Sequence, residues 1–233
     1  MNLENEKNLA QKLSDDIVDY ILKNNLVPGD KLPNELILSE LMGVGRSSIR
    51  EAMKLLASRN VVEIRQGSGT YVSKKQGIPD DPLGLTFITD KEKLIHDLIE
   101  VRFLLEPSIA GLAARNATSD DILKIESLCD EIEHLILAKK NHVQKDIEFH
   151  KAIAMSSNNV VVPRIIPIIN TSIELFITAT DSSLRDETIE SHRDITNAIK
   201  QGDVLAAQDA MYLHLLYNKK RILKNPNIIE YFK

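Results

Sequence analysis

Four residues in the carboxy-terminal half of the chain have the types and the spacing of a metal site. Asp146 and His150 are four residues apart in the segment QKDIEFHKAI, so a helix there places both on one face. His192 and His214 lie about ten residues before and about eleven residues after Gly202-Asp203, a pair typical of a turn between helices. At 1.5 Å per residue both histidines stand roughly 15 to 17 Å from that turn, and antiparallel packing brings them level. One carboxylate and three imidazoles can bind zinc, nickel, cobalt, manganese or iron with coordination positions left open.

The pair formed by Asp146 and His150 has other interpretations when it is taken alone. It could be a catalytic acid and base, or two polar groups on a solvated helical face. A metal-dependent enzyme would need a general base beside the metal, and no second motif supplies one. The only cysteine, Cys129, excludes an internal disulfide and a Cys-based zinc cluster. The remaining histidines lack such partners and are expected to be surface or packing residues: His96, His134 and His142.

The segment that carries these residues is predicted to be all helical. From residue 90 to 222 the chain is rich in helix formers and shows no strand alternation. Cap signals such as Asp90 and Thr118 divide it into six helices. These are expected over residues 90–115, 118–140, 142–156, 160–180, 186–201 and 203–222. A linker over 76–89, broken by prolines and glycines, precedes this domain, and a tail over 223–233 follows it.

The amino-terminal part differs from the rest of the chain in its charge. The net charge of the whole chain is −5, yet residues 46–75 hold seven basic groups and two acidic ones. A polyanion would dock at such a basic island. The charge by itself does not exclude the alternative, in which these residues form a solvated basic face that binds no partner.

Local structure favours DNA as that polyanion. Apolar spacing predicts helices over residues 8–25, 36–42 and 46–59, the last two joined by the tight turn Gly43-Val44-Gly45, as in a helix-turn-helix. Arg46 and Arg50 lie one turn apart on the outer face of the third helix, beside the hydroxyls of Ser47 and Ser48. Arginine can bind guanine through two hydrogen bonds, and hydroxyls and a helix N-terminus can hold phosphates.

A β-hairpin is predicted directly after this helix, in the segment VVEIRQGSGTYV. Its glycine-rich tip makes it a wing, in which Gly67 permits close approach to the sugar-phosphate chain. Arg65 and Gln66, just before this glycine, can reach into a groove of the DNA. Residues 1–75 are therefore expected to form a winged helix-turn-helix domain.

The segment PGDKLPNELILSELMGVGRSSIREAMKLLASRNVVEIRQGSGTYV resembles the winged helix of the GntR family of bacterial transcription regulators. The resemblance covers nearly all of residues 8–73. It implies that the positions of Arg46, Ser47, Ser48 and Arg50 contact operator DNA, with Gln66 and Gly67 at the wing tip. The chain differs from the family pattern in two positions. Leu36 stands where many relatives carry arginine or another polar residue, and Gly45 replaces a polar residue such as Ser or Thr, so the operator sequence is left open.

The second half resembles the FCD effector domain of the FadR subfamily of these regulators. The matching segments are LIEVRFLLEPSIAGLAA, DIEFHKAIAMSSNN, ESHRDITNAIKQGD and AMYLHL. The resemblance implies that Asp146, His150, His192 and His214 bind a divalent metal, zinc first among the candidates, at the floor of an effector cavity. It also implies that Arg102 pairs with an effector carboxylate.

Together these features predict a mainly α protein, in which an amino-terminal winged helix-turn-helix is joined to an all-helical effector-binding bundle. It is expected to be a repressor that binds double-stranded, palindromic operator DNA as a homodimer. Its effector is expected to be a small organic acid such as a sugar acid, a hydroxy acid or a dicarboxylate. A regulator that senses the metal itself stays open, and a metal-dependent enzyme is the remote alternative. With no apolar run long enough to span a membrane, the protein is expected in the cytoplasm.

Overall fold

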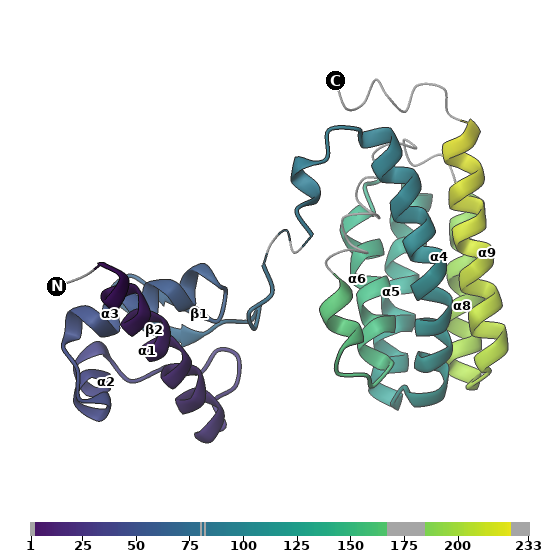
Figure 1. Cartoon of the computed structure of the whole chain (residues 1–233). Coiled ribbons are helices and arrows are strands. Elements are labelled where there is room, and N and C mark those ends of the chain that lie inside the picture. Colours follow the sequence, from purple (N-terminus) through teal and green to yellow (C-terminus); the bar gives the residue numbers. More distant parts are fainter. Residues whose placement is uncertain (1–2, 80, 82, 167–184, 225–233) are drawn as a thin grey trace. The chain divides into compact units, whose positions relative to one another are not determined.

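The computed structural model describes residues 3–79, 81, 83–166 and 185–224. The chain separates into two compact units, Met1–Pro82 and Leu83–Lys233, which are described one at a time (Figure 1). The predicted fold class is confirmed, since the first unit is a winged helix-turn-helix and the described part of the second is helical. Within the described ranges no helix is long and apolar enough to cross a membrane.

Three helices form the body of the first unit: α1 (Leu3–Lys23), α2 (Glu35–Met42) and α3 (Arg46–Ser58). The Asn34 side chain starts α2 by accepting a hydrogen bond from the backbone N–H of Ile37. Gly43 ends α2 in the left-handed conformation, with φ of 66°, which glycine adopts without a steric cost. The short connection turns the chain at once into α3, as the sequence predicts.

The wing is a two-stranded antiparallel hairpin of β1 (Val62–Arg65) and β2 (Gly69–Val72). Val62 pairs with Val72 at its base and Arg65 with Gly69 at its tip, where Gly67 has a φ of 71°. The base of the hairpin continues the apolar core of the three helices. This core includes Leu13, Ile17, Leu38, Ile49, Leu56, Val62 and Val72. Each such side chain stabilises the fold by about 1.5 to 3 kcal/mol when fully buried.

After a short 3-10 turn at Leu85–Phe87, the described part of the second unit contains five long helices and a helical stretch at residues 162–166. The long helices are α4 (Lys91–Asn116), α5 (Ser119–Leu137), α6 (Val143–Ser156), α8 (Arg185–Gln201) and α9 (Val204–Lys224). Asp90 caps α4 by accepting from the N–H of Lys93, and Thr118 forms a capping box with Asp121 at the start of α5. Gly202 has a φ of 70°, and Asp203 accepts from the N–H of Ala206 at the start of α9.

Helix α4 packs against α6, α8 and α9 (Figure 1). Helix α5 packs against α6 and α8, and α8 forms an antiparallel pair with α9. The shared core includes Ile99, Ile132, Phe149, Ile195 and Leu215. The helix predicted over 160–180 lies outside the described residues from 167 onward. The predicted tail, 223–233, lies outside them from 225 onward.

Candidate functional site

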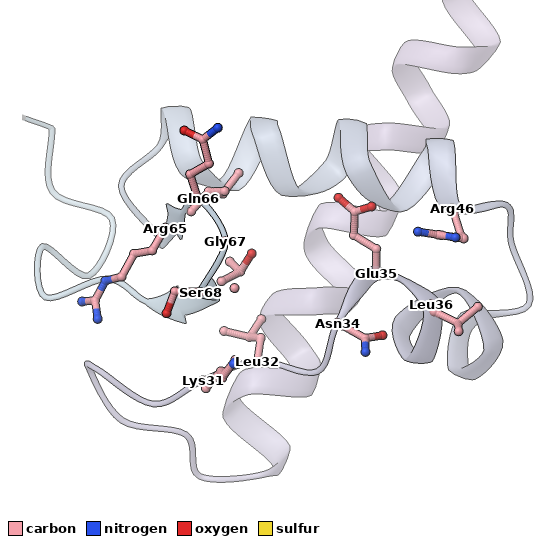
Figure 2. A pocket seen from close by; sticks show the side chains of 13 residues that line it. Lys31, Leu32, Asn34, Glu35, Leu36, Arg46, Arg65, Gln66, Gly67 and Ser68 are labelled. Atoms are coloured by element: carbon pink, nitrogen blue, oxygen red, sulfur yellow. The ribbon is translucent and has the colours of Figure 1, made fainter.

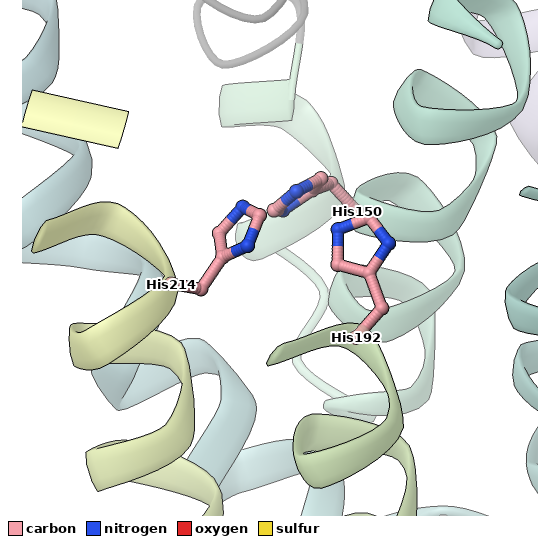
Figure 3. A group of neighbouring side chains, drawn as sticks. All are labelled: His150, His192 and His214. Atoms are coloured by element: carbon pink, nitrogen blue, oxygen red, sulfur yellow. The ribbon is translucent and has the colours of Figure 1, made fainter. Parts of the chain in front are cut away.

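Three histidines from three helices meet inside the helical unit (Figure 3). His150 lies on α6, His192 on α8 and His214 on α9, and all three are buried. One ring nitrogen from each lies within 4.8 Å of the other two. Two nitrogens bound to one ion at about 2.1 Å can be at most about 4.2 Å apart. The three rings could therefore share one ion only after small side-chain movements that bring their nitrogens closer.

The environment of His192 fits a metal ligand. Its exposed fraction is 1%, and neither ring nitrogen has a hydrogen-bond partner. Burial lowers the pKa of His192 to about 4, although the nearby Asp146 carboxylate opposes this shift. The ring is therefore neutral near pH 7, which is the form that binds a metal. Phe149 supports it with a ring centroid 4.5 Å away.

His214 is held from both sides by polar partners. Asn218 Nδ2 lies 3.1 Å from its Nε2, and Ser191 Oγ lies 3.0 Å from its Nδ1. Because the Ser191 hydroxyl donates to the carbonyl of Thr188, its oxygen can accept from Nδ1–H of His214. Burial lowers the pKa of His214 well below its ordinary value, so this ring is neutral too. In this tautomer the Nε2 lone pair accepts from the Asn218 amide, so Nε2 could bind a metal only after that amide has moved away.

Asp146 joins the cluster through one histidine. Its Oδ1 lies 3.3 Å from Nε2 of His192, while the group of mutually close nitrogens consists of the three imidazoles. His142, the residue that precedes α6, is also buried, with 7% exposure, and its Nδ1 has no hydrogen-bond partner. The sequence assigned His142 to the surface or to packing. Its buried, unpartnered nitrogen adds a polar group on the same face of α6 as Asp146 and His150.

Arg102 lies beside the imidazoles rather than on the surface. Its exposed fraction is 1%, and its Nη2 lies 3.5 Å from Nε2 of His150. Glu106, one turn later on α4, accepts hydrogen bonds from Nε and Nη2 of Arg102. The same carboxylate contacts the other side of His150, with Oε2 2.5 Å from Nδ1. A buried guanidinium, a carboxylate and an imidazole therefore form one continuous group.

Glu106 is the residue of this site that the sequence analysis missed. Burial raises its pKa, but attraction to Arg102 and His150 outweighs burial and lowers the pKa to about 2. Glu106 is thus a carboxylate at neutral pH although its exposure is 3%. The signal in the sequence was its position four residues after Arg102, the spacing of an ion pair on a helix.

The predicted DNA-contacting residues of the first unit lie at the start of α3 and at the tip of the wing, and all are exposed except Ser48, which is partly buried. A groove joins these two places (Figure 2). Arg46 lines it at the end of α3, and Arg65, Gln66 and Gly67 line it on the wing. Leu36, one of the two departures from the family pattern, lines it as well, with 48% exposure. Arg50, Ser47 and Ser48 lie on α3 outside this groove.

Two of these arginines are paired with acidic side chains. Glu35 accepts two hydrogen bonds from Arg50, at 3.1 and 2.7 Å. Glu63 pairs with Arg65, whose guanidinium also lies 4.2 Å from the centre of the Tyr71 ring. Side chains held in this way lose less rotamer freedom when they bind a ligand. The first turn of α3 has no side-chain cap at Gly45, which leaves the N–H groups of Arg46 and Ser47 for an anion such as phosphate, while that of Ser48 donates to the Gly45 carbonyl.

A winged helix with basic groups on its recognition helix and wing, followed by a helical unit with a buried polar site, defines a DNA-binding transcription regulator. Residues 9–72 match the family described as "Bacterial regulatory proteins, gntR family", and residues 97–217 match the FCD domain. The chain therefore belongs to the gntR family and carries an FCD domain. This is a family of transcription regulators and not of enzymes.

Full-length relatives agree with this assignment. The Uxu operon transcriptional regulator of Escherichia coli is 32% identical over 91% of this chain and 86% of its own length. The galactonate operon transcriptional repressor of Escherichia coli is 28% identical over 87% of this chain and 91% of its own length. A solved GntR structure from Streptococcus agalactiae has 42% identity and a TM-score of 0.81, covering 91% of this chain and 99% of the other.

Proposed function

We propose that the protein is a repressor whose affinity for operator DNA is set by a small organic acid bound at a divalent metal in its FCD domain. The observation that carries this proposal is the meeting of three buried imidazoles with Arg102. Imidazoles supply metal ligands, and a buried guanidinium supplies a partner for a carboxylate. A site made for the metal alone has no need of the arginine.

The metal would be held by His150, His192 and His214, with Asp146 as the fourth ligand. Two properties of the cluster support this: His192 and His214 are neutral at pH 7, and both nitrogens of His192 have no hydrogen-bond partner. Zinc is the first candidate, and nickel, manganese, cobalt and iron suit the same donor set. When bound, the ion supplies a positive charge that carboxylate and hydroxyl oxygens can coordinate.

The effector is a small acid with oxygen donors close to its carboxylate, so sugar acids, hydroxy acids and dicarboxylates are the classes to test. Its carboxylate would be received by Arg102, which already lies 3.5 Å from His150. The relative named for the galactonate operon acts on genes named for a sugar acid, which supports this class.

On the DNA side, Arg46 and Arg50 would read base edges while Ser47 and Ser48 hold phosphates. Arg65, Gln66 and Gly67 would approach the adjacent groove from the wing. One recognition helix reads one half-site, so a homodimer on a palindromic operator is expected. The acid can change the DNA affinity only if it binds two conformations of the dimer with different affinities, and that difference sets the size of the change.

The experiment is a titration of the operator complex with D-galactonate, L-lactate and succinate at constant Zn²⁺, and with Zn²⁺ alone. One class of acid should change the affinity of the protein for the operator. For a repressor, the acid should lower this affinity and release the protein from the DNA. A response to the metal alone, with no response to any acid, would instead assign the protein as a metal sensor.

A further inference from the structure

The carboxylate of Glu106 connects two parts of the buried site. It lies on α4, with 3% exposure, between Arg102 on its own helix and His150 on α6. Its Oε2 lies 2.5 Å from Nδ1 of His150, an ion-pair contact without hydrogen-bond geometry, and it accepts a hydrogen bond from Nη2 of Arg102 at 3.4 Å. Its Oε1 accepts from Nε of Arg102. The Glu106 side chain thus touches both His150, a proposed metal ligand, and Arg102, the proposed partner of the effector carboxylate.

We infer that Glu106 is a positioning residue, which directs Nε2 of His150 toward the metal and holds Arg102 ready for the effector carboxylate. The inference rests on the proposed function and adds a residue to it. Neither the family match nor the spacing of the four metal candidates assigns a role to Glu106.

The first role follows from the chemistry of imidazole. A neutral ring has one N–H donor and one lone pair, so the partner of one nitrogen decides what the other can do. A carboxylate beside Nδ1 favours the proton there and leaves the lone pair on Nε2. This is the common arrangement of a metal-bound histidine, whose other nitrogen donates to a carboxylate or a carbonyl. Among the three imidazoles, His150 has a carboxylate at Nδ1 and His214 has Ser191 there.

The second role follows from the charge of Arg102. A buried guanidinium without a partner is strongly unfavourable, and Glu106 neutralises it in the absence of effector. The contacts with Glu106 use Nε and Nη2, which leaves Nη1 for a second carboxylate. Arginine can bind two carboxylates on its two edges, so the effector can join the pair without displacing Glu106.

The test replaces Glu106 and measures the affinity of the full chain for Co²⁺ alone, together with the visible absorption of the bound ion. Glu106→Gln keeps the shape but removes the charge, and it should weaken Co²⁺ binding by about 10- to 100-fold, as is usual for such partners of metal ligands. The absorption spectrum should also change, because His150 no longer has a fixed orientation. Unchanged affinity with an unchanged spectrum would overturn the inference.

Two further backgrounds show whether Glu106 acts through His150. In the His214→Ala background, Glu106→Gln should weaken Co²⁺ binding by the same factor as in the wild type. In the His150→Ala background, Glu106→Gln should not weaken Co²⁺ binding further. An equal loss in both backgrounds would mean that Glu106 supports the fold and does not position His150. The variant Arg102→Met with Glu106→Gln leaves no unpaired buried charge, so it reports on His150 even where the single variant folds poorly.

The outcome for the wild-type chain separates the two proposals. If the wild type binds no Co²⁺, the proposed metal-dependent function fails together with this inference. If it binds Co²⁺ and Glu106→Gln binds it equally well with the same spectrum, the proposed function stands and only the role of Glu106 fails.

Discussion

Replacing His192 by leucine separates a metal ligand from a packing residue, because the two roles predict opposite changes in stability. Neither buried ring nitrogen of His192 makes a hydrogen bond, and only Nε2 has a polar neighbour, Oδ1 of Asp146 at 3.3 Å. An unpartnered polar group costs about 1 to 3 kcal/mol, so Nδ1, which has no polar neighbour, costs about that much in the metal-free fold. Leucine has a similar volume and no polar atom, and swaps that conserve volume usually cost less than about 1.5 kcal/mol. His192→Leu should therefore stabilise the metal-free protein by up to roughly 2 kcal/mol.

With Zn²⁺ bound, the wild type should become more stable than His192→Leu. A ligand at 100 times its Kd stabilises the fold by about 2.7 kcal/mol, and in a chain of this size each kcal/mol moves Tm by about 2 to 4 °C. Zn²⁺ should raise the Tm of the wild type by several degrees and leave the Tm of His192→Leu unchanged.

The assay is thermal unfolding of both full chains with and without Zn²⁺, after removal of metal with a chelator. His134→Leu is the matched control, since His134 is exposed on α5 and should leave both Tm and the Zn²⁺ response as in the wild type. A metal-free His192→Leu protein that is less stable than the wild type and still responds to Zn²⁺ would refute the reasoning.

Three further predictions concern the two units. His150→Ala and His214→Ala should each lower the bound metal from roughly one ion per chain, measured by elemental analysis of purified protein, because each removes one ligand. Arg46→Ala and Arg50→Ala should weaken operator binding by about 1 to 3 kcal/mol where the arginine reads a base, measured by fluorescence anisotropy. Glu35→Gln should raise affinity for unrelated DNA and lower the ratio of operator to unrelated binding, since it removes a negative charge and the orientation of Arg50.

Each of these has its own control and its own contrary result. Lys93→Ala, an exposed change on α4, controls for the general loss of a positive charge in DNA binding. Operator affinity that survives both arginine changes would remove the recognition-helix assignment. Full metal retention in both histidine variants would rule out this ligand set, and an unchanged specificity ratio in Glu35→Gln would show that Arg50 needs no orientation by Glu35.

Helix boundaries could be predicted because their signals are local. Asp90, Thr118 and Asp203 start helices through hydrogen bonds to residues three positions later. The proximity of His192 and His214 also followed from counting residues on both sides of one turn, and their ring centroids lie 4.8 Å apart. Both inferences need only the fixed rise of a helix and a tight turn.

The partners of Arg102 could not be predicted in the same way. An acid four residues after an arginine is usually a solvated ion pair, and the sequence does not show how α4 is rotated in the bundle. The packing of α4 against α6, α8 and α9 decides that Arg102 and Glu106 face inward. The same holds for His142, whose burial depends on how α6 lies against its neighbours, and for Asp146, which contacts His192.

The central claim is that an organic acid binds this protein through the metal held by the histidine cluster. Calorimetric titration of D-galactonate, L-lactate and succinate into the Zn²⁺-loaded and the metal-stripped full chain tests it directly. At least one acid should bind the Zn²⁺-loaded chain with a stoichiometry near one, and its affinity should fall below detection in the stripped chain. Equal affinity in both samples, or no binding of any acid to a Zn²⁺-loaded chain, would contradict it.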